Sequence, residues 1–435
     1  MSRKDFFSPT TAISVVIANM VGTGVFASLG YQLLDIQSGF VLLMLWVVGG
    51  ITACCGALSY AELGATLPRS GGEYNFLGRI YHPVAGFVSG WVSSTIGFSA
   101  PVALTAITFG TYLSSVFPVL SPKWLAIALI LVLTFIHASS RRNSGGFQRV
   151  FTAIKLLLII LFCMFALILV KEPTSLSFMP KPGDGALITS GAFAIALIYV
   201  NYAYTGWNAA TYLSSELEHP QKSLPRVLGY GTLIVMLLYL ALNFTFLRVA
   251  PIDALSGQLD IGYIAAQHVL GDIGAAIMGI VLAVLLISTV SAMILSGPRV
   301  LHVIGQDYPM FKLLGKTNKN GVPTMAIFCQ SILALLFVVN SSFQQIMIFA
   351  SFTLGLNTLL AVIGLFVLRW QLPNIDRPYK TFGYPITPLI YITLMSWTLT
   401  YTAIQKPKEA LGAVVIIAIG LLLYFISSRF QPNQA

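Results

Sequence analysis

Charged residues are scarce in this chain. Asp, Glu, Lys and Arg make up only 9% of its 435 residues, whereas hydrophobic residues make up 57%. A water-soluble domain usually carries about a quarter charged residues, so most of this chain cannot form a surface that faces water. The composition, with a mean hydropathy of +0.84, predicts an all-α integral membrane protein whose bulk partner is the lipid bilayer.

Cysteine is also rare, and no motif indicates a cofactor. Cys54, Cys55, Cys163 and Cys329 all fall in apolar segments without paired spacing, which is typical of small buried side chains rather than of disulfides. The five histidines show no metal-ligand spacing, and the Ser-Gly-Gly at 70–72 lacks the Lys-Ser/Thr of a phosphate-binding loop. We therefore expect no cofactor, no metal site and no nucleotide-driven pump.

Long apolar runs are abundant by contrast. A helix that spans the bilayer needs about 20 mostly apolar residues, and runs bounded by charges, Pro and Gly predict twelve such helices within a single domain, 1–435. Residues 1–9 are short and polar, so we expect no cleaved signal peptide. The expected spans are 10–34, 39–67, 84–117, 123–139, 147–170, 186–215, 227–249, 273–303, 323–339, 343–368, 386–404 and 411–428.

The basic residues are distributed as in a membrane protein with an even number of spans. If the N-terminus is inside, seventeen of the 24 lysines and arginines are cytoplasmic and six are external, with Lys155 left inside a span. Cytoplasmic loops carry such an excess. We therefore expect both termini in the cytoplasm and the protein in the cell membrane, and we attribute the net charge of +10 to this bias rather than to a nucleic-acid partner.

Two expected spans have polar, glycine-containing centres. Gly22, Thr23 and Gly24 interrupt the first span, and Gly206 lies within the polar segment 201–208 of the sixth. Glycine weakens a helix, and backbone groups freed in lipid need polar partners, so we predict discontinuous first and sixth helices around a cavity. Close helix packing would explain one Gly-x-Gly better, but interruptions at matching places in two halves indicate a transporter site.

The interval between the two breaks is five helices. This spacing predicts a five-plus-five inverted repeat, with 10–170 as the first copy and 186–368 as the second, because an odd number of spans makes the second copy enter from the opposite face. The segment 386–428 then supplies two additional helices.

The two breaks favour different charges. The half-helix after the first break offers free N–H groups and a positive dipole end to a carboxylate, whereas carbonyls freed at the second suit an ammonium group. An α-amino acid carries both groups. No Asp or Glu falls in the middle of an expected span, and Glu62 lies near the cytoplasmic end of the second. A cationic side chain would therefore lack a counter-ion, so the sequence favours neutral amino acids.

Four further charged residues have two interpretations each. Lys155 either extends its ammonium toward the membrane interface or has a functional role inside the membrane, by replacing a bound cation or exchanging a proton. We favour the functional role. Glu62, Arg69 and Glu73 flank a Gly-rich cytoplasmic loop, where a gating ion-pair network and ordinary solvated charges are equally compatible with the pattern.

Four segments resemble one transporter superfamily. They are VGTGVF at 21–26, SYAELGATLPRSGGEY at 59–74, YAYTGWN at 202–208 and PQKSLPR at 220–226. They resemble the amino acid–polyamine–organocation superfamily, particularly bacterial relatives of the L-type amino acid transporters, over essentially the whole chain. The resemblance implies the leucine-transporter fold, with the five-plus-five repeat and two further helices.

The resemblance also implies roles for individual residues. Gly22, Thr23 and Gly24 would hold the substrate carboxylate, and Lys155 stands where a lysine replaces the second sodium ion. Thr23 replaces the family's usual serine, and Thr205 replaces a frequent glycine, which narrows the pocket. In the sixth helix the carbonyls of Tyr202, Ala203 and Thr205 would hold the amine, with Tyr202 as an aromatic gate and Asn208 shaping the pocket.

We therefore expect secondary active transport of L-amino acids, favouring neutral ones, by sodium-independent alternating access. Exchange and proton coupling are both open, and no accessory subunit is evident from the sequence. The alternatives are a polyamine or cationic amino-acid transporter of the same superfamily, and a membrane-embedded enzyme. The enzyme would need convergent nucleophilic, acid–base or metal-binding groups, which the sequence does not offer.

Overall fold

The fold consists of helices joined by loops. The computed structural model describes residues 8–139 and 144–429, and in this part of the chain there is no β-strand. The extreme termini, expected in the cytoplasm, lie outside the described residues. Nine described segments are long and apolar enough to cross a membrane: Pro9–Gln32, Gly39–Thr66, Pro83–Val116, Pro122–Ser139, Val150–Leu169, Pro220–Val249, Ile261–Asp307, Phe343–Gln371 and Pro407–Ser428.

Three expected spans are not among those nine. The helices α10 (Gly191–Tyr204) and α15 (Thr324–Asn340) are apolar but shorter than 18 residues. The helix α17 (Ile386–Gln405) has 20 residues, but Thr, Ser and Tyr side chains interrupt its apolar sequence. All three are helical at the expected places.

Some expected spans are divided into shorter helices. A π-helical turn, η1 (Ser93–Gly97), separates two helices of the third expected span. Gly297 divides the eighth expected span between a helix that ends at Ser296 and one that begins at Pro298. The remaining elements are α1 (Pro9–Met20), α2 (Thr23–Gln32), α3 (Gly39–Thr66), α4 (Glu73–Ile80), α5 (Pro83–Val92), α6 (Ser99–Val116), α7 (Pro122–Ser139), α8 (Ser144–Leu169), α9 (Asp184–Ile188), η2 (Ala209–Glu216), α11 (Pro220–Val249), α12 (Ile252–Leu255), α13 (Ile261–Ser296), α14 (Pro298–Asp307), η3 (Pro309–Phe311), α16 (Phe343–Gln371) and α18 (Pro407–Ser428).

Serine side chains define the starts of several long helices. Ser38 caps α3 by accepting a hydrogen bond from the N–H of Val41, and Ser190 caps α10 in the same way. At α16, Ser342 and Gln345 form a reciprocal capping box. Such caps satisfy N–H groups that have no partner inside the helix, and they fix where each helix enters the bundle.

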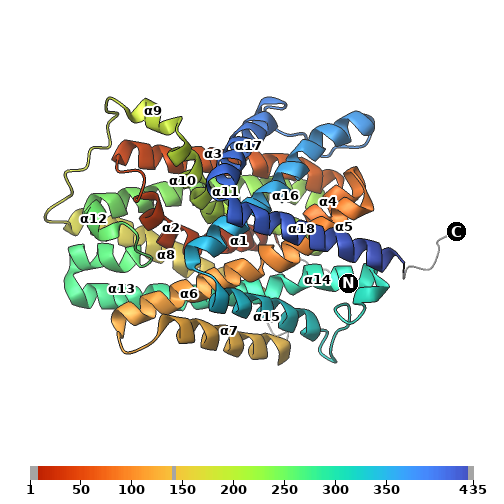
Figure 1. Ribbon diagram of the computed structural model, residues 1–435, viewed down its shortest axis with the longest axis horizontal. Helices are drawn as coiled ribbons and strands as arrows, with labels where there is room; N and C mark the ends of the chain where they lie inside the picture. Colours follow the sequence, from red (N-terminus) through yellow and green to blue (C-terminus); the bar gives the residue numbers. More distant parts are fainter. Residues whose placement is uncertain (1–7, 140–143, 430–435) are drawn as a thin grey trace.

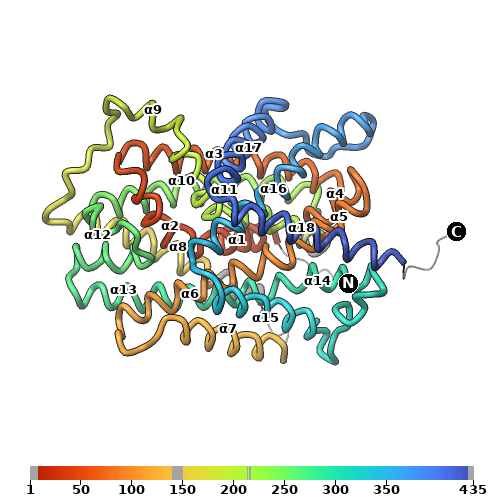
Figure 2. Tube along the Cα trace, in the orientation of Figure 1, coloured from red at the N-terminus to blue at the C-terminus, as the bar shows by residue number. Residues whose placement is uncertain are grey.

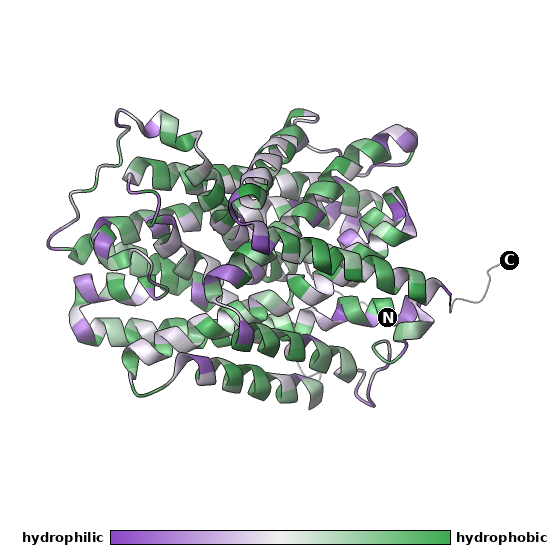
Figure 3. Cartoon of the chain, in the orientation of Figure 1, coloured by the Kyte–Doolittle hydropathy of each residue, from purple (hydrophilic) through white to green (hydrophobic). Residues whose placement is uncertain are grey.

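The helices that contain the two predicted breaks lie in the interior of the bundle. Figure 1 shows α1 and α10 surrounded by longer helices, with α7 and α15 along one side. The tube in Figure 2 shows α2 running beside α10, and these two helices are in contact. α1 packs against α11 and α8, and α3 packs against α11. Hydrophobic residues dominate the helices, and hydrophilic residues gather in the loops toward the two ends (Figure 3).

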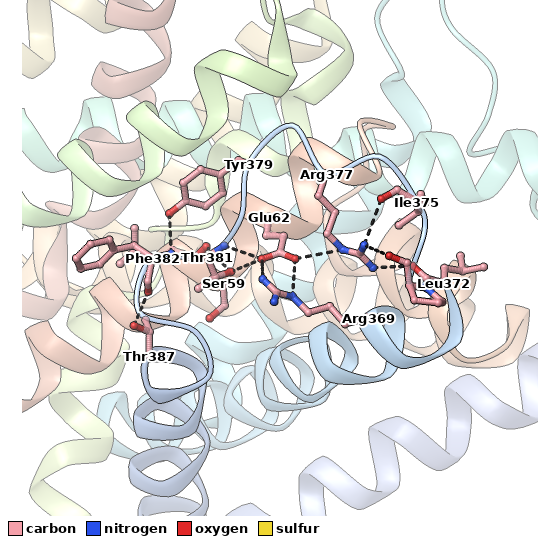
Figure 4. Close-up of polar contacts among 12 residues, drawn as sticks. Ser59, Glu62, Arg369, Leu372, Ile375, Arg377, Tyr379, Thr381, Phe382 and Thr387 are labelled. Carbon is pink, nitrogen blue, oxygen red and sulfur yellow. Dashed lines mark hydrogen bonds and ion pairs between the residues drawn. The ribbon is translucent and has the colours of Figure 1, made fainter.

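A buried ion-pair cluster joins α3 to the chain that leaves α16 (Figure 4). Glu62 is 0% exposed, and Arg369 donates to both of its carboxylate oxygens, from Nε at 2.8 Å and from Nη2 at 2.7 Å. Nε of Arg377 lies 3.6 Å from the same carboxylate, and the N–H and hydroxyl of Thr381 both donate at 2.7 Å. The interpretation of Glu62 as a solvated loop charge was therefore wrong.

Replacing Glu62 by glutamine is expected to destabilise the protein. Removing one partner of a buried ion pair leaves an uncompensated charge and costs about 3–5 kcal/mol, and here Arg369 and Arg377 would both lose their carboxylate. Thermal unfolding of the purified protein in detergent measures the effect. Asp376→Asn, at an exposed carboxylate in the loop that contains Arg377 and Thr381, is the matched control. Equal unfolding midpoints for the two variants would contradict the stabilising role of Glu62.

Candidate functional site

The structure contains a break at each of the two predicted places. α1 ends at Met20 and α2 begins at Thr23, and Gly22 between them has φ −140° and ψ −149°, far from helical values. α10 ends at Tyr204, and the chain leaves the helix through Gly206, whose φ of +107° lies in the region that favours glycine. Both breaks therefore free backbone groups inside the bundle.

The two breaks are in contact with each other's helices. A Cβ at Gly24 would lie against the Cα of Ala203 in α10 and within 2.9 Å of its Cβ. A Cβ at Gly206 would lie 2.9 Å from the carbonyl carbon and oxygen of Asn19 in α1. Each break thus needs glycine because the other broken helix approaches it, so close packing and the break are two aspects of one arrangement.

Both breaks line one central cavity. Its empty volume is about 1170 Å³ when the part open to solvent is included. α13 and α16 also contribute to its wall, through residues such as Ser296 and Asn357. The structure brings all seven residues expected to bind substrate to this cavity: Gly22, Thr23, Gly24, Tyr202, Ala203, Thr205 and Asn208.

The first turn of α2 presents hydrogen-bond donors to the cavity. The first N–H groups of a helix have no partner within it and carry the positive end of the helix dipole, and Gly22, Thr23 and Gly24 supply them here. The Thr23 hydroxyl is hydrogen-bonded to the hydroxyl of Thr108 in α6. This side of the cavity can therefore hold an anionic group.

The second break presents carbonyl groups, two of which already have partners. The carbonyl of Tyr202 accepts from the N–H of Thr205 at 2.9 Å, and that of Ala203 accepts from the Tyr239 hydroxyl at 3.0 Å. A carbonyl oxygen has two lone pairs, so both can still accept from a ligand. Tyr239 also donates to the carbonyl of Met20 at 2.6 Å and so joins the ends of α1 and α10.

Lys155 is buried behind the first break. Its side chain is 2% exposed, and Nζ donates to the carbonyl of Val21 at 2.8 Å and to Oγ1 of Thr289 at 2.7 Å. Lys155 does not line the cavity; it fixes the end of α1 to α8 and α13 from outside it. The alternative that its ammonium extends to the interface was wrong.

Glu73 is an unexpected member of the cavity wall. It is 1% exposed, and its carboxylate accepts from the Tyr60 hydroxyl at 2.9 Å, from Nδ2 of Asn208 at 2.6 Å and from the Tyr212 hydroxyl at 2.5 Å. The alternative of a solvated loop charge was wrong for Glu73 too. The expectation that a cationic side chain would lack a counter-ion was also wrong, because the turn at Gly71 and Gly72, with φ of +117° and +54°, brings Glu73 into the cavity wall.

Arg69, the third charged residue that flanks the Gly-rich loop, is more exposed to solvent than Glu62 and Glu73. Its guanidinium is 3.1 Å from a carboxylate oxygen of Asp307, and the side chains of this pair are 55% and 30% exposed. The Tyr74 hydroxyl also donates to Asp307, and burial, together with that carboxylate, raises the pKa of Tyr74. The pair joins the loop after α3 to the end of α14.

Comparison with known proteins identifies the family of this chain. The model of the amino acid permease family matches residues 7–432. The chain is 27% identical to the human b(0,+)-type amino acid transporter 1 over 434 residues, covering 98% of this chain and 88% of that protein. It is 28% identical to the mouse large neutral amino acids transporter small subunit 2 over 430 residues, covering 97% and 80%. The chain therefore belongs to the amino acid permease family of the amino acid–polyamine–organocation superfamily, and is a multi-pass membrane transporter rather than an enzyme.

Proposed function

We propose that this protein carries L-amino acids across the cell membrane by sodium-independent alternating access, with neutral amino acids as substrates. The observation that carries the proposal is the single cavity lined by both helix breaks. One break offers N–H donors and the other offers carbonyl acceptors, which together match the carboxylate and ammonium of an α-amino acid. The relatives named above are transporters of amino acids, which supports the same substrate class.

In this proposal each end of the substrate has its own binding groups. Gly22, Thr23 and Gly24 bind the carboxylate through the first turn of α2. The carbonyls of Tyr202, Ala203 and Thr205 bind the ammonium. Asn208 shapes the pocket for the side chain, and Tyr202, 6% exposed, closes over the bound substrate as a gate.

Lys155 replaces a sodium ion in the proposed mechanism. A cation at its position would need oxygen ligands from α1 and α13, and the ammonium takes two such oxygens, on Val21 and Thr289. A fixed positive charge then holds the first break without an exchangeable cation. We propose that coupling occurs either by exchange of substrates or by proton movement.

The proposed architecture has twelve spans in one unit, 1–435, with both termini in the cytoplasm. Residues 10–170 and 186–368 form the two inverted copies, and 386–428 adds two helices. The reciprocal approach of Gly24 to α10 and of Gly206 to α1 supports such a repeat, because two copies related by a pseudo-twofold axis meet at their equivalent breaks.

Uptake into proteoliposomes tests the proposal. Vesicles preloaded with unlabelled amino acid should accumulate labelled amino acid by counterflow, and a substrate panel with and without a pH gradient separates exchange from proton coupling. Absence of flux across a broad panel, with the protein incorporated, would reject amino-acid transport.

Sodium independence is a separate expected outcome. Replacing sodium by choline on both sides of the membrane should leave the initial rate unchanged within about twofold, because Lys155 supplies the positive charge that a bound ion would otherwise supply. The same vesicles serve as their own control when sodium is restored. A rate that falls at least about tenfold without sodium would contradict the proposed role of Lys155.

A further inference from the structure

The cavity wall contains a carboxylate whose described partners are all neutral. Glu73 accepts hydrogen bonds from the hydroxyls of Tyr60 and Tyr212 and from the amide of Asn208. Among the residues that the structure describes, no Lys, Arg or His forms an ion pair with it, although ion pairs are present at Glu62 and Asp307. Glu73 thus combines 1% exposure with the absence of a described counter-ion.

These hydrogen bonds orient the carboxylate without neutralising it. Three neutral donors suit the ionised form of a carboxylate, which is acceptor-only and has about four lone-pair positions. Ionised groups buried in proteins are generally paired with an opposite charge. A buried carboxylate that is held by neutral donors, with no cationic partner among the described residues, is therefore suited to receive a cation from a ligand.

Asn208 connects the carboxylate to the proposed substrate site. Its amide donates to Glu73 at 2.6 Å, and the same residue lines the cavity directly after the second break. Tyr212, in η2, holds the second carboxylate oxygen at 2.5 Å. The segment proposed to bind the substrate ammonium therefore continues into the segment that positions Glu73, and a side chain extending from a bound amino acid can follow it.

We propose that Glu73 sets the charge selectivity of the cavity: it pairs with a cationic side chain of the substrate, a guanidinium or an ammonium, and excludes anionic side chains. This inference rests on the proposed amino-acid transport and extends its range from neutral to cationic substrates. A neutral side chain leaves the three hydrogen bonds intact, whereas an anionic one meets an uncompensated like charge in a site of low dielectric constant.

Two pairs of closely matched amino acids test the charge preference in the wild-type protein. Arginine and citrulline differ mainly in charge at the end of similar side chains, and glutamate and glutamine form the corresponding anionic and neutral pair. Each is used to compete against labelled leucine in proteoliposome counterflow. We expect arginine to compete at least as well as citrulline, and glutamate to compete at least about tenfold less well than glutamine.

Variants at Glu73 and its neighbours then assign the preference to the carboxylate. Glu73→Gln should lower the ratio of arginine to citrulline potency at least about tenfold, and Glu73→Asp should restore part of it. Tyr212→Phe removes one hydrogen bond but keeps the charge, so that ratio should change less than about threefold. Asp376→Asn is a control for an exposed carboxylate on the loop after α16.

The outcomes separate this inference from the proposed function. Loss of arginine preference in Glu73→Gln, with its retention in Tyr212→Phe, supports the charge role. Two results would overturn the charge role of Glu73. One is that the wild type carries out leucine counterflow but citrulline competes at least about tenfold more potently than arginine. The other is that Glu73→Gln leaves the ratio of arginine to citrulline potency unchanged. If Glu73→Gln does not fold, competition by the two amino-acid pairs in the wild-type protein decides whether the inference holds. Absence of leucine and arginine counterflow in the wild type would instead reject amino-acid transport.

Discussion

Replacing Lys155 by alanine is expected to reduce amino-acid flux at least about 100-fold while the protein still inserts into the membrane. The variant removes two hydrogen bonds from a charged donor, to Val21 and Thr289. Such bonds contribute about 1.5–3 kcal/mol each, and about 1.4 kcal/mol corresponds to a factor of ten in rate. The carbonyl of Val21, freed by the end of α1, would also lose its partner within the membrane, which lipid cannot replace.

Two further variants make this result specific. Lys155→Met keeps most of the side-chain volume without the charge, so it should be as inactive as the alanine variant if the ammonium is essential. Lys171→Ala removes an exposed lysine just beyond the end of α8 and should retain wild-type flux. Initial rates of counterflow, normalised to incorporated protein, measure all three. Wild-type flux in Lys155→Ala would show that the ammonium does not support the first break.

Replacing Gly24 by valine is expected to reduce transport at least about tenfold. Even a single methyl group at this position would collide with the Cα of Ala203, and backbone cannot move aside as a flexible side chain can. Overpacking costs about 1–3 kcal/mol when neighbours can adjust. The larger valine would force α2 away from α10 and so separate the two groups of backbone atoms that line the cavity.

Gly229→Val provides the matched control for this prediction. Gly229 also lies in a membrane helix, α11, but a Cβ there would meet only Cδ2 of Leu58, at an ordinary 3.9 Å. Its transport should stay within about twofold of wild type. Similar flux in the Gly24 and Gly229 variants would show that close approach of α2 and α10 is not required for transport.

The helix breaks and the buried lysine were predictable because each leaves a local mark in the sequence. Two glycines one residue apart, or a polar and glycine-containing segment, stand out within an apolar run, and so does a single lysine such as Lys155. The structure places the breaks side by side and the lysine behind the first of them. Polar and glycine residues within apolar runs were sufficient for this, because an unsatisfied polar group inside the membrane is costly.

The acidic residues were not predictable in the same way. Glu62 and Glu73 lie near the end of an apolar run, where local sequence is equally compatible with solvent exposure. Their burial depends on tertiary contacts, from Arg369 far along the chain for one and from the turn at Gly71 and Gly72 for the other. Tyr239 was also missed, although a tyrosine in the middle of an apolar span is itself a signal of a buried hydrogen bond.

Competition by modified substrates tests most directly whether the two breaks bind the two ends of an amino acid. Leucine methyl ester lacks the free carboxylate and the α-keto acid of leucine lacks the ammonium, while both keep the side chain. If α2 binds the carboxylate and the carbonyls after α10 bind the ammonium, each analogue should inhibit leucine counterflow at least about 100-fold more weakly than leucine. Inhibition by either analogue at the concentration effective for leucine would contradict this assignment.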